Sequence, residues 1–196
     1  MKRSTAIGHL VEMGTVATES IALREMQNGW PLVEIWLTGE LLEPGGDLDA
    51  GSVILMLDTV PAETTWLAMH PDGEWVGDRL RLGKRPMLWC YRPSTWPPWN
   101  ARYQRVARIW SDASGLDGPA IDLLRSNRSP QIIQPSADEF RKQLVEERRA
   151  SFEHLRKIVD GYWEPQHRRR GADRHAGENH LWRAAAGLIE IEDALT

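Results

Sequence analysis

Residues 36–58, WLTGELLEPGGDLDAGSVILMLD, decide how this chain folds. An apolar segment runs into a turn at Gly39, and an Asp-Leu-Asp triplet containing Asp47 and Asp49 precedes a second apolar segment at residues 53–57. Side chains at positions i and i+2 of an extended segment point to the same side, so we expect the two carboxylates to lie together. Mg²⁺ prefers oxygen ligands of this kind. The stretch therefore predicts two strands joined by a loop with a candidate metal site.

The segments around this stretch extend the predicted sheet. Residues 32–37 predict a strand, the uninterrupted apolar run at 53–57 is typical of a strand covered on both faces, and residues 87–91 predict a third strand. Helically spaced apolar residues predict a first helix, capped by Ser4 and ending near residue 28, and a short helix over residues 74–82. The predicted order is helix, strand, strand, helix, strand.

The second half of the chain predicts helices. After the proline-rich segment STWPPWN at residues 94–100, we expect a helix over 100–111 and a short helix over 117–126. Ser136 and Glu139 have the spacing of a capping box, which indicates that a long helix starts there. Its expected apolar stripe consists of Phe140, Leu144, Phe152, Leu155, Val159 and Tyr162. A last helix is expected over residues 181–195, after a charged loop.

We therefore predict an α+β fold: a small mixed sheet with an N-terminal helix and a C-terminal helical extension. The expected division is an α/β domain over residues 1–95 and a helical extension, packed on it, over residues 96–196. A chain of 196 residues with 41% hydrophobic content can bury a sizeable core in this arrangement. Ten tryptophans against two phenylalanines favour a core built with Trp over an aromatic platform for bases or sugars.

Composition excludes several classes of protein. The net charge of −4 gives no global basic field for nucleic acid, and the single cysteine, Cys90, excludes a disulfide framework or a multi-cysteine metal site. No apolar run reaches the ~20 residues of a membrane span, and the N-terminus has no uninterrupted apolar stretch of signal-peptide length. We expect a cytoplasmic protein without a membrane partner.

The order of the first elements, the turn at Gly39 and the Asp47/Asp49 pair resemble the nucleotidyltransferase superfamily of the polymerase-β type, over roughly the first 95 residues. The resemblance implies a glycine turn that holds triphosphate, an acidic pair that binds two Mg²⁺ ions, and a third acid from a later strand. The chain as a whole also resembles an uncharacterised, Trp-rich family of bacterial proteins, and that resemblance implies no function.

Carried over residue by residue, the resemblance assigns Gly39 and Glu40 to nucleotide binding and Asp47 and Asp49 to the metal. Glu40 stands where the family has a serine, and a carboxylate there would repel triphosphate. The third strand, residues 87–91, has no carboxylate, so Asp58 is the candidate third catalytic acid, provided that the strand end folds back. These departures favour a degenerate site over an active one. The turn composition of the GGDLDAG segment also fits a solvated turn.

Arg168, Arg169 and Arg170 are candidate contacts to an acceptor substrate or an acidic partner, because guanidinium groups donate in pairs to phosphate and carboxylate. A solvated loop is the alternative for these arginines.

Three functions remain open at this stage. The first is a nucleotidyltransferase-like protein with a degenerate site that binds a nucleotide or a partner protein. The second is an active Mg²⁺-dependent nucleotidyltransferase acting on a small molecule, RNA or protein. The third is a helical protein–protein interaction module.

Overall fold

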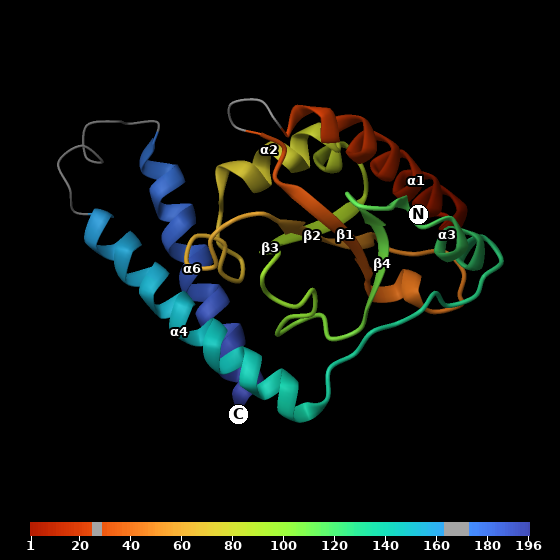
Figure 1. Cartoon of the computed structure of the whole chain (residues 1–196). Helices are drawn as coiled ribbons and strands as arrows, with labels where there is room; N and C mark the ends of the chain where they lie inside the picture. Colours follow the sequence, from red (N-terminus) through yellow and green to blue (C-terminus); the bar gives the residue numbers. More distant parts are fainter. Residues whose placement is uncertain (25–28, 163–172) are drawn as a thin grey trace.

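The computed structural model describes residues 1–24, 29–162 and 173–196 (Figure 1). Its centre is a five-stranded mixed sheet in the order β3-β2-β1-β4-β5. The strands are β1 (Leu32–Thr38), β2 (Gly51–Leu57), β3 (Met87–Pro93), β4 (Val106–Ser111) and β5 (Gly115–Leu116). Only β2 and β3 pair in parallel, and helix α2 makes the crossover between them. The three strands predicted from the sequence are confirmed.

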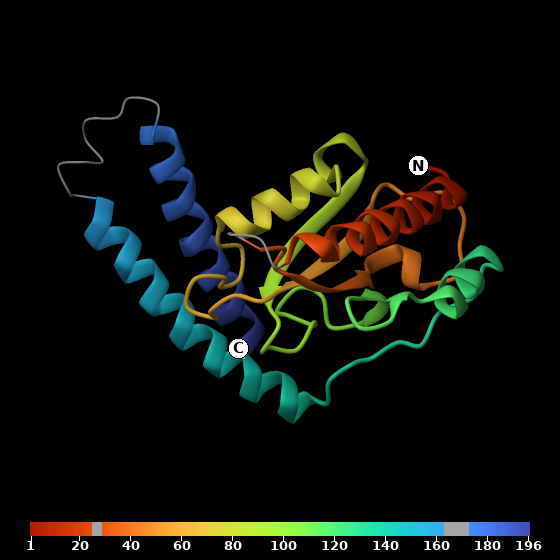
Figure 2. The same cartoon turned by 45° about the horizontal axis from the view of Figure 1, so that its top comes forward.

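Five α-helices surround the sheet in the described part of the chain: α1 (Arg3–Ser20), α2 (Pro71–Arg79), α3 (Gly118–Arg125), α4 (Ala137–Tyr162) and α6 (Asp173–Leu195). Helices α1 and α2 lie over one face of the sheet, and α4 and α6 form a hairpin beyond the β3 side (Figure 2). The α+β fold with an N-terminal helix, a mixed sheet and a helical extension is therefore as predicted from the sequence.

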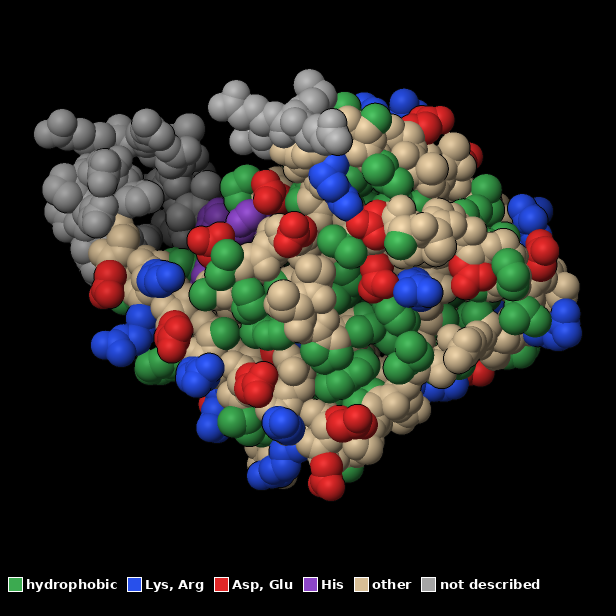
Figure 3. All heavy atoms as spheres, in the orientation of Figure 1, with side chains coloured by type: hydrophobic (Ala, Val, Ile, Leu, Met, Phe, Trp, Pro, Cys, Tyr) green, Lys and Arg blue, Asp and Glu red, His purple; other side chains and the backbone are tan. Residues whose placement is uncertain are grey.

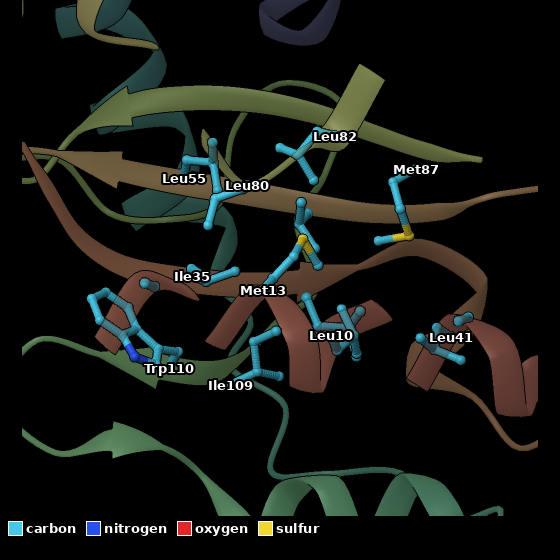
Figure 4. Close-up of a cluster of buried hydrophobic side chains, with 14 of the residues drawn as sticks. Leu10, Met13, Ile35, Leu41, Leu55, Leu80, Leu82, Met87, Ile109 and Trp110 are labelled. Atoms are coloured by element: carbon cyan, nitrogen blue, oxygen red, sulfur yellow. The ribbon is translucent and has the colours of Figure 1, made fainter. Parts of the chain in front are cut away.

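Helix α1 packs on the sheet through side chains spaced three and four residues apart. Leu10, Met13 and Ala17 are fully buried, and they meet strand residues such as Ile35 in the main core (Figure 4). The predicted cap at Ser4 is wrong, because the helix begins one residue earlier, at Arg3, and its cap position makes no side-chain hydrogen bond.

Tryptophan fills much of the interior, as the composition predicts. Trp30, Trp66 and Trp110 are each at most 2% exposed, and a second apolar cluster on the opposite side of the sheet contains Trp36 and Trp99. The indole N–H of Trp110 donates to a threonine hydroxyl of α1, at 2.9 Å. Burial with a partner for the polar N–H is the usual state of a core tryptophan.

The helix predicted over residues 100–111 is wrong, because the chain forms strand β4 there and inserts it beside β1, with Ile35 opposite Trp110. Val106, Ile109 and Trp110 are fully buried, and β-branched and aromatic side chains of this kind favour strands once a sheet offers them a place. The sheet and α3 therefore continue past the boundary expected at residue 95, and the helical part begins with α4.

The capping box that predicted α4 is present. The backbone N–H of Ser136 donates to the Glu139 carboxylate at 2.9 Å, and the backbone N–H of Glu139 donates to the Ser136 hydroxyl at 3.3 Å. Helix α4 begins at the next residue, Ala137. Within the described segments, none of the helices has the length and apolarity needed to cross a membrane.

Candidate functional site

The acidic loop, residues 43–50, lies at the end of the sheet where β1 stops and β2 starts. Thr38 pairs with Ser52, so Gly39 and Glu40, which follow β1, lie at the same end as Asp47 and Asp49, which precede β2. Gly39 has a φ of +74°, a left-handed conformation that suits glycine. The structure therefore brings these four predicted residues to one end of the sheet.

Hydrogen bonds and burial at several points hold the acidic loop. Leu48 is 6% exposed, and its backbone N–H donates to the carbonyl of Met1 at 2.8 Å. The guanidinium of Arg3 donates to the carbonyls of Leu41 and Glu43, at 3.0 and 2.8 Å. Asp47 and Asp49 flank the buried leucine and are both exposed. Because Leu48 between them is buried, both carboxylates face solvent.

The third acid of the candidate metal site is not near this pair. Asp58 is exposed at the far end of β2, and the seven residues of that strand span roughly 20 Å at ~3.3 Å per residue. Strand β3 starts beside β2 with Met87 opposite Gly51, and it contributes no carboxylate. Among the described residues, no three His, Cys, Asp or Glu side chains are placed to hold one metal ion. Two exposed carboxylates on a loop could at most bind a cation loosely.

The predicted acceptor contacts Arg168, Arg169 and Arg170 lie outside the described residues. Cys90 is a half-buried free cysteine on β3, and burial raises the pKa of its thiol to about 12, although Arg92 and Arg102 act in the opposite direction. A thiol with so high a pKa is a poor nucleophile and a poor metal ligand at neutral pH.

The helical hairpin is attached to the sheet by a buried ion pair. Arg92 at the end of β3 is 1% exposed, Glu147 in α4 is fully buried, and the guanidinium donates to both carboxylate oxygens. The Arg92 Nε–H also donates to the carbonyl of Pro97, at 2.9 Å, and the Gln143 amide donates to Glu147, at 3.2 Å. Both buried charges therefore have hydrogen-bond partners, which is the condition for burying them at all.

Helix α6 is attached at the loop before α2. The Trp66 indole N–H donates to the Glu190 carboxylate at 2.8 Å, and Arg102 pairs with the same carboxylate. Gly187 faces the backbone of Trp66 so closely that a Cβ atom there would lie 2.1 Å from the Trp66 carbonyl oxygen. Together with the Arg92–Glu147 pair, these contacts attach one side of the hairpin to the α/β part, and the other side is left uncovered by the described residues.

The uncovered side carries large apolar side chains. Val145, Phe152 and Val159 in α4 are 44%, 53% and 42% exposed, and Trp182 and Ile189 in α6 are 69% and 60% exposed. We call these five side chains the outer face. In each helix they recur every seven residues, so each set forms one row along its helix.

The alignment of α4 and α6 brings the two rows of the outer face to the same heights along the hairpin. Arg148 and Glu192 form an ion pair of 3.6 Å between α4 and α6, which run antiparallel. One helical turn further along the hairpin, the same alignment places Phe152 beside Ile189. Two turns beyond that, Val159 comes beside Trp182. The rows therefore form two apolar layers that cross both helices.

Charged rows border the apolar ones. Lys142, Arg149 and Arg156 are exposed and recur every seven residues along α4, next to the row of Val145, Phe152 and Val159. Side chains of both signs cover the part of α4 that is visible in Figure 3. At the C-terminal end of α6, Glu192 and Asp193 are exposed. The row next to the apolar residues of α4 is thus basic, the exposed acids Glu146, Glu153 and Asp160 form the row beyond it, and the end of α6 is acidic.

Sequence reasoning assigned Phe152 and Val159 to the packed stripe of α4, and the structure exposes them instead. The packed side contains Leu144, Glu147 and Ser151, of which two are polar. A buried Glu that pairs with an Arg 55 residues away carries no local signal. The sequence of α4 contains two adjacent apolar rows, one through Leu144 and one through Val145. A helix that packs on one surface needs only one such row, so the second row was the signal for the outer face.

The full chain, residues 1–196, matches the family described as Domain of unknown function (DUF7711), and it belongs to that family. No curated protein and no solved structure matches it. This family has no stated activity, so the function proposed below is argued from the residues of this chain.

Proposed function

We propose that this chain is a binding protein that holds an α-helical partner on the outer face of its hairpin. We also propose that its α/β part is nucleotidyltransferase-like, with a degenerate site, since the described residues form no complete metal site. The observation that carries the proposal is the exposure of five large apolar side chains in two aligned rows, Trp182 being 69% exposed. Contiguous exposed apolar patches on a folded protein commonly mark interaction surfaces.

The attachment of the hairpin supports this proposal. Arg92, Glu147 and Gly187 attach the inner side to the α/β part, so the outer face is presented on a preformed surface. A preformed surface binds with a smaller loss of conformational entropy than a flexible one. The seven-residue spacing of both rows fits the side chains of α-helices, which suggests a helical partner, not an extended peptide.

Photo-crosslinking in living cells tests the proposal. A photoreactive phenylalanine analogue replaces Phe152 in one variant and Glu146, an exposed residue on the same helix, in a control variant. We expect a specific crosslinked protein from position 152 and none from position 146. Replacing Ile189 by Ser in the first variant should then abolish the crosslink. Equal crosslinking from both positions, or none from position 152, would refute the proposed function.

A second candidate, the active Mg²⁺-dependent transferase, is favoured by the clustering of Gly39, Glu40, Asp47 and Asp49 at one end of the sheet. Calorimetry of the chain with Mg²⁺ and ATP, GTP, CTP or UTP tests it. Tight binding that disappears in an Asp47→Asn/Asp49→Asn variant of unchanged melting temperature would show a nucleotide site at this loop, and turnover of the bound nucleotide would then establish the transferase. We expect no such binding, because no third carboxylate of the described residues joins the pair. A cytoplasmic location also stays part of the proposal.

A further inference from the structure

We infer that a second copy of this chain occupies the outer face, so that two hairpins form an antiparallel four-helix bundle. This inference rests on the partner-binding function proposed above and names the partner. It follows from the alignment of the two apolar rows, from the charges along their rims and from the size of the surface.

The first argument is the match between the outer face and itself. A two-fold axis parallel to the helices places α4 of one copy over α6 of the other, and every residue stays at its own height along the bundle. The layer of Phe152 and Ile189 then meets the same layer of the second copy, and the layer of Val159 and Trp182 does likewise. Each copy thus presents apolar side chains at the same seven-residue spacing to the other copy.

The second argument is charge complementarity. The same axis brings the basic row of α4 to the acidic end of α6 in the second copy, where Arg149 lies at the height of Glu192 and Asp193. Opposite charges along the rim of a bundle set the orientation of its helices.

The third argument is size. Together with the charged residues that border it, the outer face extends from about Lys142 to Asp160 on α4, which is roughly 27 Å at 1.5 Å per residue, and two helices are roughly 20 Å wide. Its footprint is therefore on the order of 500 Å² per copy, or about 1,000 Å² in total, which reaches the lower limit of a specific interface. Arg148 and Glu192, which pair across α4 and α6, stay paired with each other in such an interface, so neither charge is buried without a partner.

Sedimentation equilibrium of the full chain tests the inference. We expect the wild-type chain to form dimers, and Phe152→Glu or Ile189→Glu to weaken the dimer at least about tenfold by placing a charge in an apolar layer. Glu146→Lys, a charge change outside the apolar rows, should leave the dimer intact. Circular dichroism checks that every variant keeps its helix content. A wild type that stays monomeric at high concentration, or a dimer that both variants leave unchanged, would overturn the inference.

A charge exchange tests the orientation. Arg149→Glu and Asp193→Arg should each weaken the dimer, and the double variant should restore it, because the two residues meet between copies. A double variant weaker than both single variants would contradict the antiparallel bundle. The crosslinking experiment separates the inference from the function on which it rests. A crosslink from position 152 to a different protein keeps the function and overturns self-association, whereas a crosslink to the chain itself supports both.

Discussion

Removing the charge of Glu147 should destabilise the chain more than any other single conservative change in the hairpin. Glu147 is fully buried, and Arg92, at 1% exposure, donates to both of its oxygens. In Glu147→Gln the guanidinium keeps its bond to the Pro97 carbonyl but loses the only negative charge that it contacts in the described structure. Removing one partner of a buried ion pair costs ~3–5 kcal/mol. Because the glutamine carbonyl still accepts a hydrogen bond, we expect the lower end, ~3 kcal/mol.

Urea unfolding of the full chain measures this loss. A loss of this size is a large part of the ~5–15 kcal/mol by which domains are stable. The control is Glu146→Gln, one residue earlier and exposed, which should change stability by less than about 0.5 kcal/mol. The double variant Arg92→Met/Glu147→Leu should lose less than Glu147→Gln alone, because it leaves no unpaired buried charge. Equal stabilities for Glu147→Gln and Glu146→Gln would refute the role of the pair in holding the hairpin.

Three further predictions concern the helices. Gly187→Ala should destabilise by ~1–3 kcal/mol in thermal melts, because its Cβ meets a backbone oxygen at 2.1 Å, whereas Gly8→Ala in α1, which has open space, should stabilise by up to ~1 kcal/mol. Burial lowers the pKa of His154 in the folded chain, so its contribution to stability is complete above about pH 6.5 and falls as the pH drops below that value. Unfolding curves of His154→Gln across this range should show a weaker pH dependence than the wild type. Ser136→Ala should cost ~1 kcal/mol in urea unfolding through the loss of its bond to the Glu139 N–H, and an unchanged midpoint would contradict this.

Much of the fold was predictable because local signals set it. The apolar run of β2 and the capping box at Ser136 carry their structure within a few residues, and both predictions are confirmed. Strand β4 was not predictable from its own sequence, because its place is created by β1, about 70 residues earlier. Long-range pairing of this kind overrides local propensity.

The candidate site was also predictable only where local spacing determined it. The neighbourhood of Asp47 and Asp49 followed from their spacing, whereas the distance of Asp58 depended on the length and direction of β2. The outer face could not be assigned from α4 alone, because two adjacent apolar rows leave open which one packs on the sheet. The Arg92–Glu147 pair determines which row packs on the sheet, because it turns Leu144 inward and Val145 outward.

Hydrogen exchange followed by mass spectrometry tests the central claim, that the outer face and not the acidic loop is the binding surface. The full chain is measured at low and high concentration, and again with Mg²⁺ and ATP. We predict slower exchange across residues 145–159 and 182–189 as the concentration rises, and no change across residues 39–49 with Mg²⁺ and ATP. Protection of residues 39–49 by Mg²⁺ and ATP, with exchange in α4 and α6 independent of concentration, would contradict the claim.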